Sequence, residues 1–268
     1  MINPKITVIM GIYNCETTLE ESLDSLLNQT FQDFEVIMCD DGSKDNTYEV
    51  AKRFLVNNPE KFVLLKNLQN MGLNHTLNRC LQCAKGMYIA RMDGDDISLP
   101  TRFEIQLKFL KDNPNVEIVS TAMIYFDESG DWGISKPKIE PQPQDLIYGT
   151  PFAHAPCMVK REAYIAVNGY TVNRKLLRVE DYHLWTKMYS KGFRGYNIQQ
   201  PLYKMRDDKN AAQRRSFKFR LNDSYVKYLI VKKLNLPFRN YFYILRPIVV
   251  GLLPQKLYIH LHKKKLAN

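Results

Sequence analysis

The sequence predicts an α/β fold, in which a mostly parallel sheet is flanked by helices and followed by a helical tail. Four short apolar runs alternate with segments of helical periodicity, at residues 5–12, 34–39, 62–65 and 88–92. The runs are almost continuously apolar, as is typical of strands that are buried on both faces. Strands that alternate with helices form parallel sheets through right-handed crossovers, so we expect one sheet with covered faces.

The helices between these strands are predicted from their caps and their apolar spacing. After the first strand, Thr17 or Thr18 stands three residues before Glu20 or Glu21, which is the spacing of a capping box. Leucines at helical spacing follow this signal. Two further helices are expected before the third and fourth strands, at residues 46–56 and 73–84.

The fourth apolar run leads directly into an acidic cluster, Asp93-Gly94-Asp95-Asp96. Three carboxylates this close repel one another, and a divalent cation offsets the repulsion because Mg²⁺ and Mn²⁺ prefer oxygen ligands. The alternative is a solvated acidic loop. Position favours the metal site, because open α/β sheets bind ligands at the carboxyl ends of their strands. A helix should follow, with Ser98 as its cap and Pro100 in its first turn.

A second acidic pair, Asp40-Asp41, follows the second apolar run. The carboxyl ends of parallel strands share one edge, so both acidic groups should face the same crevice. Neither a G-x-G-x-x-G nor a G-x-x-x-x-G-K-[ST] loop is present, which argues against dinucleotide oxidoreductases and phosphate-loop ATPases. A diphosphate held by a metal ion remains the favoured ligand.

Charge is unevenly distributed along the chain, whose net charge is +10. Residues 201–268 contain 16 Lys and Arg against three acidic residues, whereas the first 200 residues contain 22 against 25. A basic tail on a mildly acidic body requires a partner of negative charge.

The five cysteines are scattered and odd in number, so they do not form a disulfide framework. Residues 1–5 lead straight into a strand, and we therefore expect no signal peptide and a reducing cytoplasm. Cys80 and Cys83 fall within a helical pattern, and without a second C-x-x-C they indicate packing residues rather than a zinc site.

Several ordered motifs together resemble family-2 glycosyltransferases, which have the Rossmann-like GT-A fold. They are Val8–Asn14, Gln29–Glu35, Cys39–Thr47, Ala90–Asp96, Gly169-Tyr170 and Val179–Trp185, so the resemblance covers residues 5–190. One departure is Gly11, where the family usually has proline. The resemblance is to enzymes of bacterial cell-surface polysaccharide synthesis, such as capsule or O-antigen.

The resemblance implies roles for the acidic residues of the first half. Asp41, together with Asp40, would bind the uracil or other base of a nucleotide-sugar. Asp93 and Asp95 would be the family's D-x-D motif, with Asp95 as the direct ligand of Mn²⁺ or Mg²⁺. The implied nucleotide-binding set is Tyr13, Asn14, Asp40, Asp41 and Asp93.

The resemblance also implies that Asp181 is the general base. Inverting transfer needs one carboxylate to take the proton of the attacking hydroxyl and a cation to neutralise the departing nucleoside diphosphate. Read without the resemblance, Glu180-Asp181 is a pair of acids favoured by the dipole in the first turn of a helix. Glu180 is a candidate contact to donor or acceptor.

Two further residues are candidates for substrate contacts. His154 precedes an apolar run, where a polar residue of this family lines the active site, although a lone histidine is more often a structural hydrogen-bonding group. Arg178 either helps to hold the diphosphate or only pairs with Glu180.

We expect residues 1–110 to form the nucleotide-sugar-binding half, residues 111–203 the acceptor-binding half and residues 204–268 a basic, aromatic helical tail. The longest apolar stretch of the tail is too short to cross a bilayer. Basic, aromatic and amphipathic segments lie in membrane interfaces, so an anionic membrane is the favoured partner. The alternatives are a solvated helical face with a disordered Lys263-Lys264-Lys265 end, or nucleic acid, which we do not expect.

The predicted activity is inverting, metal-dependent transfer of a hexosyl or N-acetylhexosaminyl group from a UDP-sugar to a glycan hydroxyl. By resemblance, the acceptor is linked to polyprenyl diphosphate and the enzyme is cytoplasmic, peripheral on the inner face of the membrane. A sugar-nucleotide pyrophosphorylase is disfavoured, because Tyr13–Glu16 replaces the glycine-rich loop that it requires after the first strand. A non-catalytic nucleotide- or nucleic-acid-binding protein that uses its basic tail is the alternative from another class.

Overall fold

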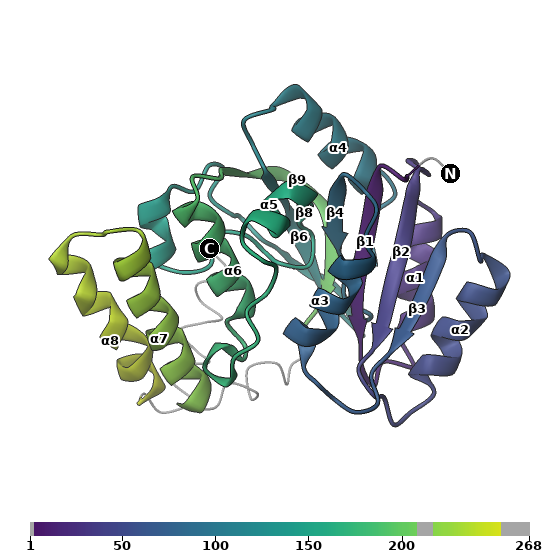
Figure 1. Cartoon of the computed structure of the whole chain (residues 1–268), viewed down its shortest axis with the longest axis horizontal. Helices are drawn as coiled ribbons and strands as arrows, with labels where there is room; N and C mark the ends of the chain where they lie inside the picture. The colour runs from purple at the N-terminus through teal and green to yellow at the C-terminus, as the bar shows by residue number, and fades with distance from the viewer. Residues whose placement is uncertain (1–2, 208–216, 253–268) are drawn as a thin grey trace.

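A computed structural model, which describes residues 3–207 and 217–252, has the predicted α/β fold (Figure 1). A nine-stranded sheet has the order β3-β2-β1-β4-β8-β6-β9-β5, and β7 pairs with β6 beside this path. The elements of the first half are β1 (Ile6–Ile12), α1 (Leu19–Leu27), β2 (Phe34–Asp40), α2 (Thr47–Asn57), β3 (Phe62–Lys66), α3 (Leu73–Cys83) and β4 (Tyr88–Arg91).

The second half begins with β5 (Ile97–Ser98) and ends with three helical elements that lie together at one end of the molecule (Figure 1). Its elements are α4 (Arg102–Asp112), β6 (Ile118–Asp127), β7 (Gly130–Ile134), η1 (Pro143–Ile147), β8 (Met158–Lys160), α5 (Arg161–Ala166), η2 (Arg174–Leu176), α6 (Glu180–Ser190), β9 (Gly195–Arg206), α7 (Phe217–Lys233), η4 (Phe238–Tyr241) and α8 (Phe242–Gly251).

The first four strands are parallel, with β1 between β2 and β4. Because side chains alternate between the faces of a strand, each strand contributes to two cores. Ile9, Ile37 and Ile89 lie in the core that includes residues of α3, α6 and α7, whereas Val8 and Ala90 lie in the core that includes α1 and α4. The predicted strands of this half are confirmed to within about a residue.

β8 connects the two halves of the sheet. It lies antiparallel between β4 and β6, and β6 then pairs in parallel with β9. The chain segment before β8 is thereby placed beside the carboxyl end of β4, where Arg91 N–H donates to the carbonyl of Cys157 at 3.0 Å.

Three local predictions are wrong. Ser98 does not cap a helix. It belongs to β5 and pairs with Tyr203 of β9, and α4 begins only after its N-cap residue, Thr101. Thr18 is at the N-cap of α1 but forms no side-chain cap, because its hydroxyl donates to Gly94 O at 2.9 Å instead. Of the two cysteines expected to pack, Cys80 is buried but Cys83 is exposed.

The basic tail begins as part of the core. α7 buries Val226, Ile230 and Val231 in the same core as Trp185 of α6. Lys227 is buried as well, and its Nζ donates to the carbonyl of Ile147. Across residues 3–207 and 217–252, no helix has both the length and the apolar character needed to cross a membrane. Residues 208–216 and 253–268, including Lys263-Lys264-Lys265, lie outside the described residues.

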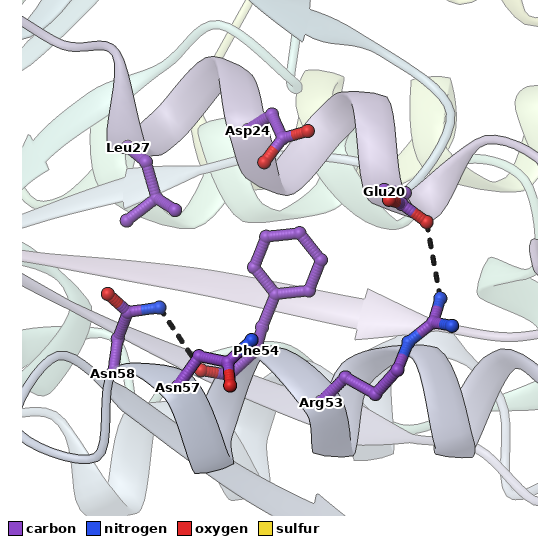
Figure 2. A pocket seen from close by; sticks show the side chains of 7 residues that line it. All are labelled: Glu20, Asp24, Leu27, Arg53, Phe54, Asn57 and Asn58. Atoms are coloured by element: carbon purple, nitrogen blue, oxygen red, sulfur yellow. Dashed lines mark hydrogen bonds and ion pairs between the residues drawn. The ribbon is translucent and has the colours of Figure 1, made fainter.

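A pocket opens between α1 and α2 (Figure 2). An ion pair of 3.2 Å between Arg53 and Glu20 closes one end of it. The pocket contains none of the residues predicted to bind nucleotide, metal or acceptor. Its lining residues are Glu20, Asp24, Leu27, Arg53, Phe54, Asn57 and Asn58.

Candidate functional site

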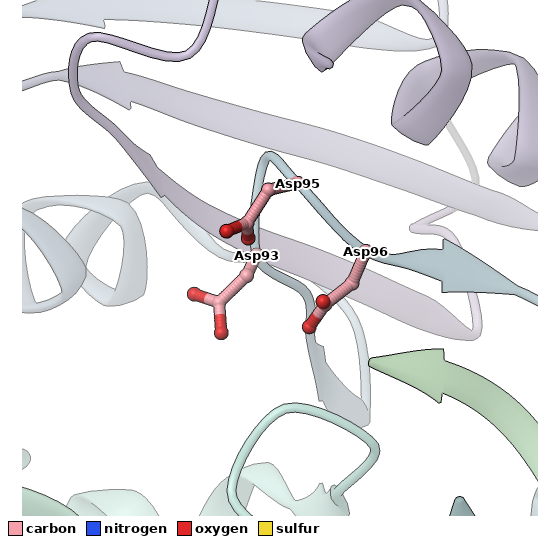
Figure 3. A group of neighbouring side chains, drawn as sticks. All are labelled: Asp93, Asp95 and Asp96. Carbon is pink, nitrogen blue, oxygen red and sulfur yellow. The ribbon is translucent and has the colours of Figure 1, made fainter. Parts of the chain in front are cut away.

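The candidate site lies at the carboxyl ends of β1, β2 and β4, as the sequence predicts. The loop after β4 places the ligand atoms of Asp93, Asp95 and Asp96 within 4.8 Å of one another. Figure 3 shows the three side chains leaving the same short turn of the chain. This proximity is the arrangement that a divalent cation requires of its carboxylate ligands.

The acidic loop is held by α1, whose first turns lie against it. Thr18 Oγ1 donates to Gly94 O, and Ser22 Oγ donates to Asp96 O at 2.7 Å. Gly94 permits this close approach, since a Cβ there would lie 2.8 Å from the Sγ of Cys15. The backbone of the loop is therefore positioned before any ligand arrives.

Asp96 fastens the loop to β9. Its carboxylate accepts from Tyr203 Oη at 2.9 Å and from Arg206 N–H at 2.8 Å, and its side chain is buried. Burial raises the pKa of Asp96 well above its usual range, and the nearby carboxylates of Asp93 and Asp95 raise it further. Asp96 thus has a structural role.

Asp93 and Asp95 differ in their surroundings. Both carboxylate oxygens of Asp93 accept from the guanidinium of Arg91, with Nη1 2.6 Å from Oδ2. The Asp95 side chain reaches solvent. Its pKa is nevertheless raised, first because the loop desolvates it and then because Asp93 lies close. Of the two, Asp95 is the carboxylate available to a cation.

The two acidic residues at the end of β2, Asp40 and Asp41, accept hydrogen bonds from neighbouring groups of the protein. Asp41 is 4% exposed and accepts from Asn67 Nδ2 at 2.7 Å, from Met71 N–H at 2.8 Å and from Gly72 N–H at 2.9 Å. These contacts hold the segment that leads into α3. Asp40 is fully buried and accepts from the backbone N–H of residue 43 at 3.2 Å.

Tyr13 and Asn14 follow β1 beside this loop. Asn14 has a positive φ of 48°, donates its N–H to Ser43 Oγ at 3.1 Å and accepts from Lys44 N–H at 2.9 Å. It therefore joins the loops after β1 and β2. The Tyr13 side chain is 42% exposed and free to stack on a planar ligand.

Asp181 lies in the first turn of α6, within electrostatic reach of Arg91. It is partly buried, and Thr150 Oγ1 lies 3.5 Å from its Oδ2. Burial raises the pKa of Asp181 to about 6, the neighbouring Glu180 raises it further, and the charge of Arg91 acts in the opposite direction. A carboxylate with this pKa is ionised at neutral pH and yet basic enough to take a proton.

His154 also lies within electrostatic reach of the Arg91 guanidinium. Its Nε2 is 2.7 Å from Tyr170 Oη, and the Tyr170 hydroxyl is 3.2 Å from that of Tyr164. Burial lowers the pKa of His154 well below its usual value, and the charge of Arg91 lowers it further. His154 is therefore a neutral hydrogen-bonding residue.

Arg178 and Glu180 do not form the ion pair that the sequence indicated as one of two roles for Arg178. Arg178 is exposed and has a φ of 68°, and the described residues show no ion pair between it and Glu180. Glu180 Oε2 is buried and without a hydrogen-bond partner in the described part of the chain. Its carboxylate is thus available to a ligand or a water molecule.

A match to a family model over more than half of the chain identifies the family. The family model described as "Glycosyl transferase family 2" matches residues 7–168. The chain belongs to glycosyltransferase family 2. The resemblance inferred from the motifs is thereby confirmed.

Two bacterial relatives span almost the whole family-2 chain. EpsE of Bacillus subtilis is 41% identical over 265 residues, covering 99% of this chain and 95% of its own length. An Escherichia coli enzyme named UDP-Gal:alpha-D-GlcNAc-diphosphoundecaprenol beta-1,3-galactosyltransferase is 34% identical over 278 residues, covering 99% and 98%. The amylovoran biosynthesis glycosyltransferase AmsE of Erwinia amylovora is 30% identical over 214 residues, covering 78% of this chain and 79% of its own length.

Solved structures share the GT-A fold. TarS of S. aureus in complex with UDP aligns with a TM-score of 0.69 at 18% identity, covering 92% of this chain and 70% of that one. The mannosyltransferase PcManGT from Pyrobaculum calidifontis, in complex with GDP-Man and Mn²⁺, aligns with a TM-score of 0.62 at 22% identity, covering 96% and 72%. At these identities the likeness concerns the fold alone.

Sequence reasoning missed three residues of the site: Arg91, Tyr203 and Arg206. Arg91 had a local signal, because it stands two residues before Asp93 and side chains two apart share a face of a strand. Tyr203 and Arg206 had none, since they reach the acidic loop from more than 100 positions away.

Proposed function

We propose that the chain is an inverting, metal-dependent glycosyltransferase that moves a hexosyl or N-acetylhexosaminyl group from a UDP-sugar to a hydroxyl of a glycan acceptor. The observation that carries this proposal is the arrangement around Arg91. The charge of the Arg91 guanidinium acts on both an available carboxylate, Asp95, and a carboxylate of suitable pKa to act as base, Asp181.

The donor atoms of the acidic loop suit a divalent cation. They are carboxylate oxygens close together, one of them solvent-accessible, and Mg²⁺ and Mn²⁺ prefer such hard ligands. Asp95 would hold the cation directly, with Asp93 beside it. When bound, the cation neutralises the negative charge that develops on the departing nucleoside diphosphate.

Asp181 would act as the general base. It would take the proton of the acceptor hydroxyl while that oxygen attacks the anomeric carbon from the face opposite the diphosphate. The glycosidic bond forms as the bond to the diphosphate oxygen breaks, so the configuration inverts. Glu180 and the neutral His154 would contact the sugars near this point, and Arg178 would approach the diphosphate.

The loops after β1 and β2 would bind the nucleoside. Tyr13 would stack on the base, and Asn14 and Asp40 would keep the two loops in place around it. Asp41 would approach the base through an oxygen that also holds the loop before α3, and Asp93 would contact the ribose. UDP is the favoured nucleotide because a related enzyme is named for UDP-Gal and TarS binds UDP.

The acceptor is proposed to be a glycan on polyprenyl diphosphate, as the name of the E. coli relative describes for that enzyme. Such an acceptor would require an enzyme at the inner face of the cell membrane. η4 and α8 offer a suitable surface, an apolar stripe of large exposed side chains that recur every three or four residues. It consists of Phe238, Phe242, Leu245, Val249 and Leu252.

The charge beside the apolar stripe suits an anionic membrane. Asp223 is the single acidic residue of the segment 217–252, which contains seven basic ones. Each Lys or Arg near an anionic leaflet contributes on the order of 1 kcal/mol to binding. Lys227 is buried, so the basic residues that could contribute are Lys218, Arg220, Lys232, Lys233, Arg239 and Arg246.

Thermal unfolding in the presence of nucleoside diphosphates, with and without Mn²⁺, tests the nucleotide and metal assignments. A ligand at 100 times its Kd stabilises by roughly 2.7 kcal/mol, so we expect UDP with Mn²⁺ to raise the Tm by several degrees. Asp95→Asn should lose the Mn²⁺-dependent part of this shift, and the surface control Asp24→Asn should keep it. A wild-type protein that is stabilised by no nucleoside diphosphate would contradict the proposal.

Asp181→Asn tests the base. The amide cannot accept the proton, so we expect transfer to fall by about 10²–10⁴-fold while the UDP–Mn²⁺ stabilisation persists. Wild-type turnover in this variant would refute the assignment.

A further inference from the structure

Arg91 is a buried cation for which the proposed chemistry has no step. It is the last residue of β4, it is 4% exposed, and its side chain shares a face of the strand with Ile89 and Asp93. Two of its N–H groups donate to the two oxygens of Asp93. A two-point pair of guanidinium and carboxylate is among the strongest polar contacts in proteins.

The other carboxylates of the acidic loop are not equally available. The two oxygens of Asp96 accept from Tyr203 Oη and from the N–H of Arg206. The Asp95 carboxylate alone of the three accepts no hydrogen bond from another described residue, although the backbone carbonyl of Asp95 accepts from Arg206 Nε at 3.0 Å. Before substrate binds, the loop therefore offers a cation one uncommitted carboxylate.

A single carboxylate is a poor site for Mn²⁺ or Mg²⁺, which bind through several oxygen ligands and release water reluctantly. A nucleoside diphosphate carries further oxygens. We propose that Arg91 is a positioning residue that competes with the divalent cation for Asp93, so that the cation binds weakly until a nucleoside diphosphate brings its own oxygens. This inference rests on the proposed metal role of Asp93 and Asp95.

The competition has a measurable consequence. Replacing Arg91 by methionine keeps a long apolar stem in the buried position and leaves Asp93, whose side chain is 33% exposed, without its partner. Asp93 can then bind the cation together with Asp95. Removal of the ion pair should therefore tighten Mn²⁺ binding, although most changes in a metal site weaken it.

The experiment measures the Kd of Mn²⁺ by electron paramagnetic resonance, with and without UDP and other nucleoside diphosphates. In the wild type we expect weak binding of Mn²⁺ alone and strong enhancement by nucleotide. Arg91→Met should bind Mn²⁺ alone about tenfold more tightly, with a correspondingly smaller enhancement by nucleotide. Arg91→Lys, which retains the charge but not the two-point contact, should fall between them.

Asp93 provides the internal control. In an Asp93→Asn background the Arg91→Met change should have no further effect on Mn²⁺ affinity, because the competed carboxylate is gone. Arg53→Met, which removes an exposed ion pair with Glu20, should bind Mn²⁺ as the wild type does. Thermal unfolding of each variant reports whether it is folded, and Arg91→Lys remains as the test if Arg91→Met is not.

Two results would overturn the inference while the proposed function stands. The first is a wild type that binds Mn²⁺ alone as tightly as with nucleotide. The second is an Arg91 variant whose Mn²⁺ affinity is unchanged, lower, or raised equally in the Asp93→Asn background. A wild type that binds no Mn²⁺ even with nucleoside diphosphate would instead refute the proposed metal site and the inference with it.

Discussion

Asp181 is the proposed general base, and its protonation state would therefore control the rate of transfer. Its pKa of about 6 results first from burial and then from Glu180, and the charge of Arg91 limits the rise. The carboxyl is thus ionised at pH 7 and neutral at pH 5, and a protonated carboxyl cannot act as a base.

We expect kcat/KM for transfer to fall as the pH is lowered through about 6, by about tenfold per pH unit below it. The measurement is a pH–rate profile at saturating Mn²⁺, with UDP binding followed separately by thermal shift. If UDP still binds at pH 5 while transfer is lost, the base is responsible. A profile that stays flat down to pH 5 would contradict the assignment.

The raised pKa of Asp181 also affects the stability of the fold. An ion-paired aspartate has a lowered pKa and stabilises the fold when ionised, whereas ionised Asp181 destabilises it. The folded-state pKa lies above the unfolded value of about 3.8, so the ionised carboxyl destabilises the fold above pH 6, and this cost disappears as the pH falls toward 4. Asp181→Asn should therefore raise stability at pH 8 by about 1–2 kcal/mol and by much less at pH 5. Urea unfolding at both pH values tests this, with Asp24→Asn as the surface control.

At the scale of elements, the acidic loop between β4 and β5 depends on partners that are distant in the chain. Local patterns predicted the strand, the turn at Gly94 and the acids that follow it, because strand alternation and turn chemistry act over a few residues. The pairing of Asp96 with Tyr203, 107 positions away, depends on where β9 enters the sheet, and no local pattern encodes that. The same limit hid the strand pairing of Ser98.

Tyr203→Phe isolates this long-range contact. The change removes the hydroxyl that donates to the buried Asp96 carboxylate and that also accepts from Asp93 N–H at 3.3 Å. A buried carboxylate that loses a donor should cost about 1–2 kcal/mol of unfolding free energy. Urea unfolding measures the cost, and Tyr228→Phe on the exposed side of α7 should be neutral. Equal stability of the two variants would mean that the contact does not hold the loop.

At the scale of the whole molecule, the basic tail consists of one helix that packs into the core and one that keeps large apolar side chains exposed. α7 packs into the hydrophobic core through Val226 and Ile230, although its buried side also includes polar residues such as Lys227. α8 packs on α7, with Gly251 close to Phe217 and Arg220, and keeps its apolar stripe exposed. Composition alone predicted a basic, aromatic tail, but it could not separate the helix that is buried in the core from the helix that keeps an exposed apolar stripe.

Introducing negative charge on the apolar stripe tests whether α8 binds membrane. Phe242→Glu with Leu245→Glu places two acids on side chains that are 72% and 56% exposed, so the fold should be unaffected. We expect the wild type to sediment with vesicles of phosphatidylcholine and phosphatidylglycerol but not with phosphatidylcholine alone, and the variant to lose most of this binding. The matched control is Ile165→Glu, 64% exposed on α5. If the variant binds anionic vesicles as the wild type does, α8 is not the membrane surface. If the wild type is instead a dimer in solution and the variant is a monomer, the stripe binds a second copy of the chain.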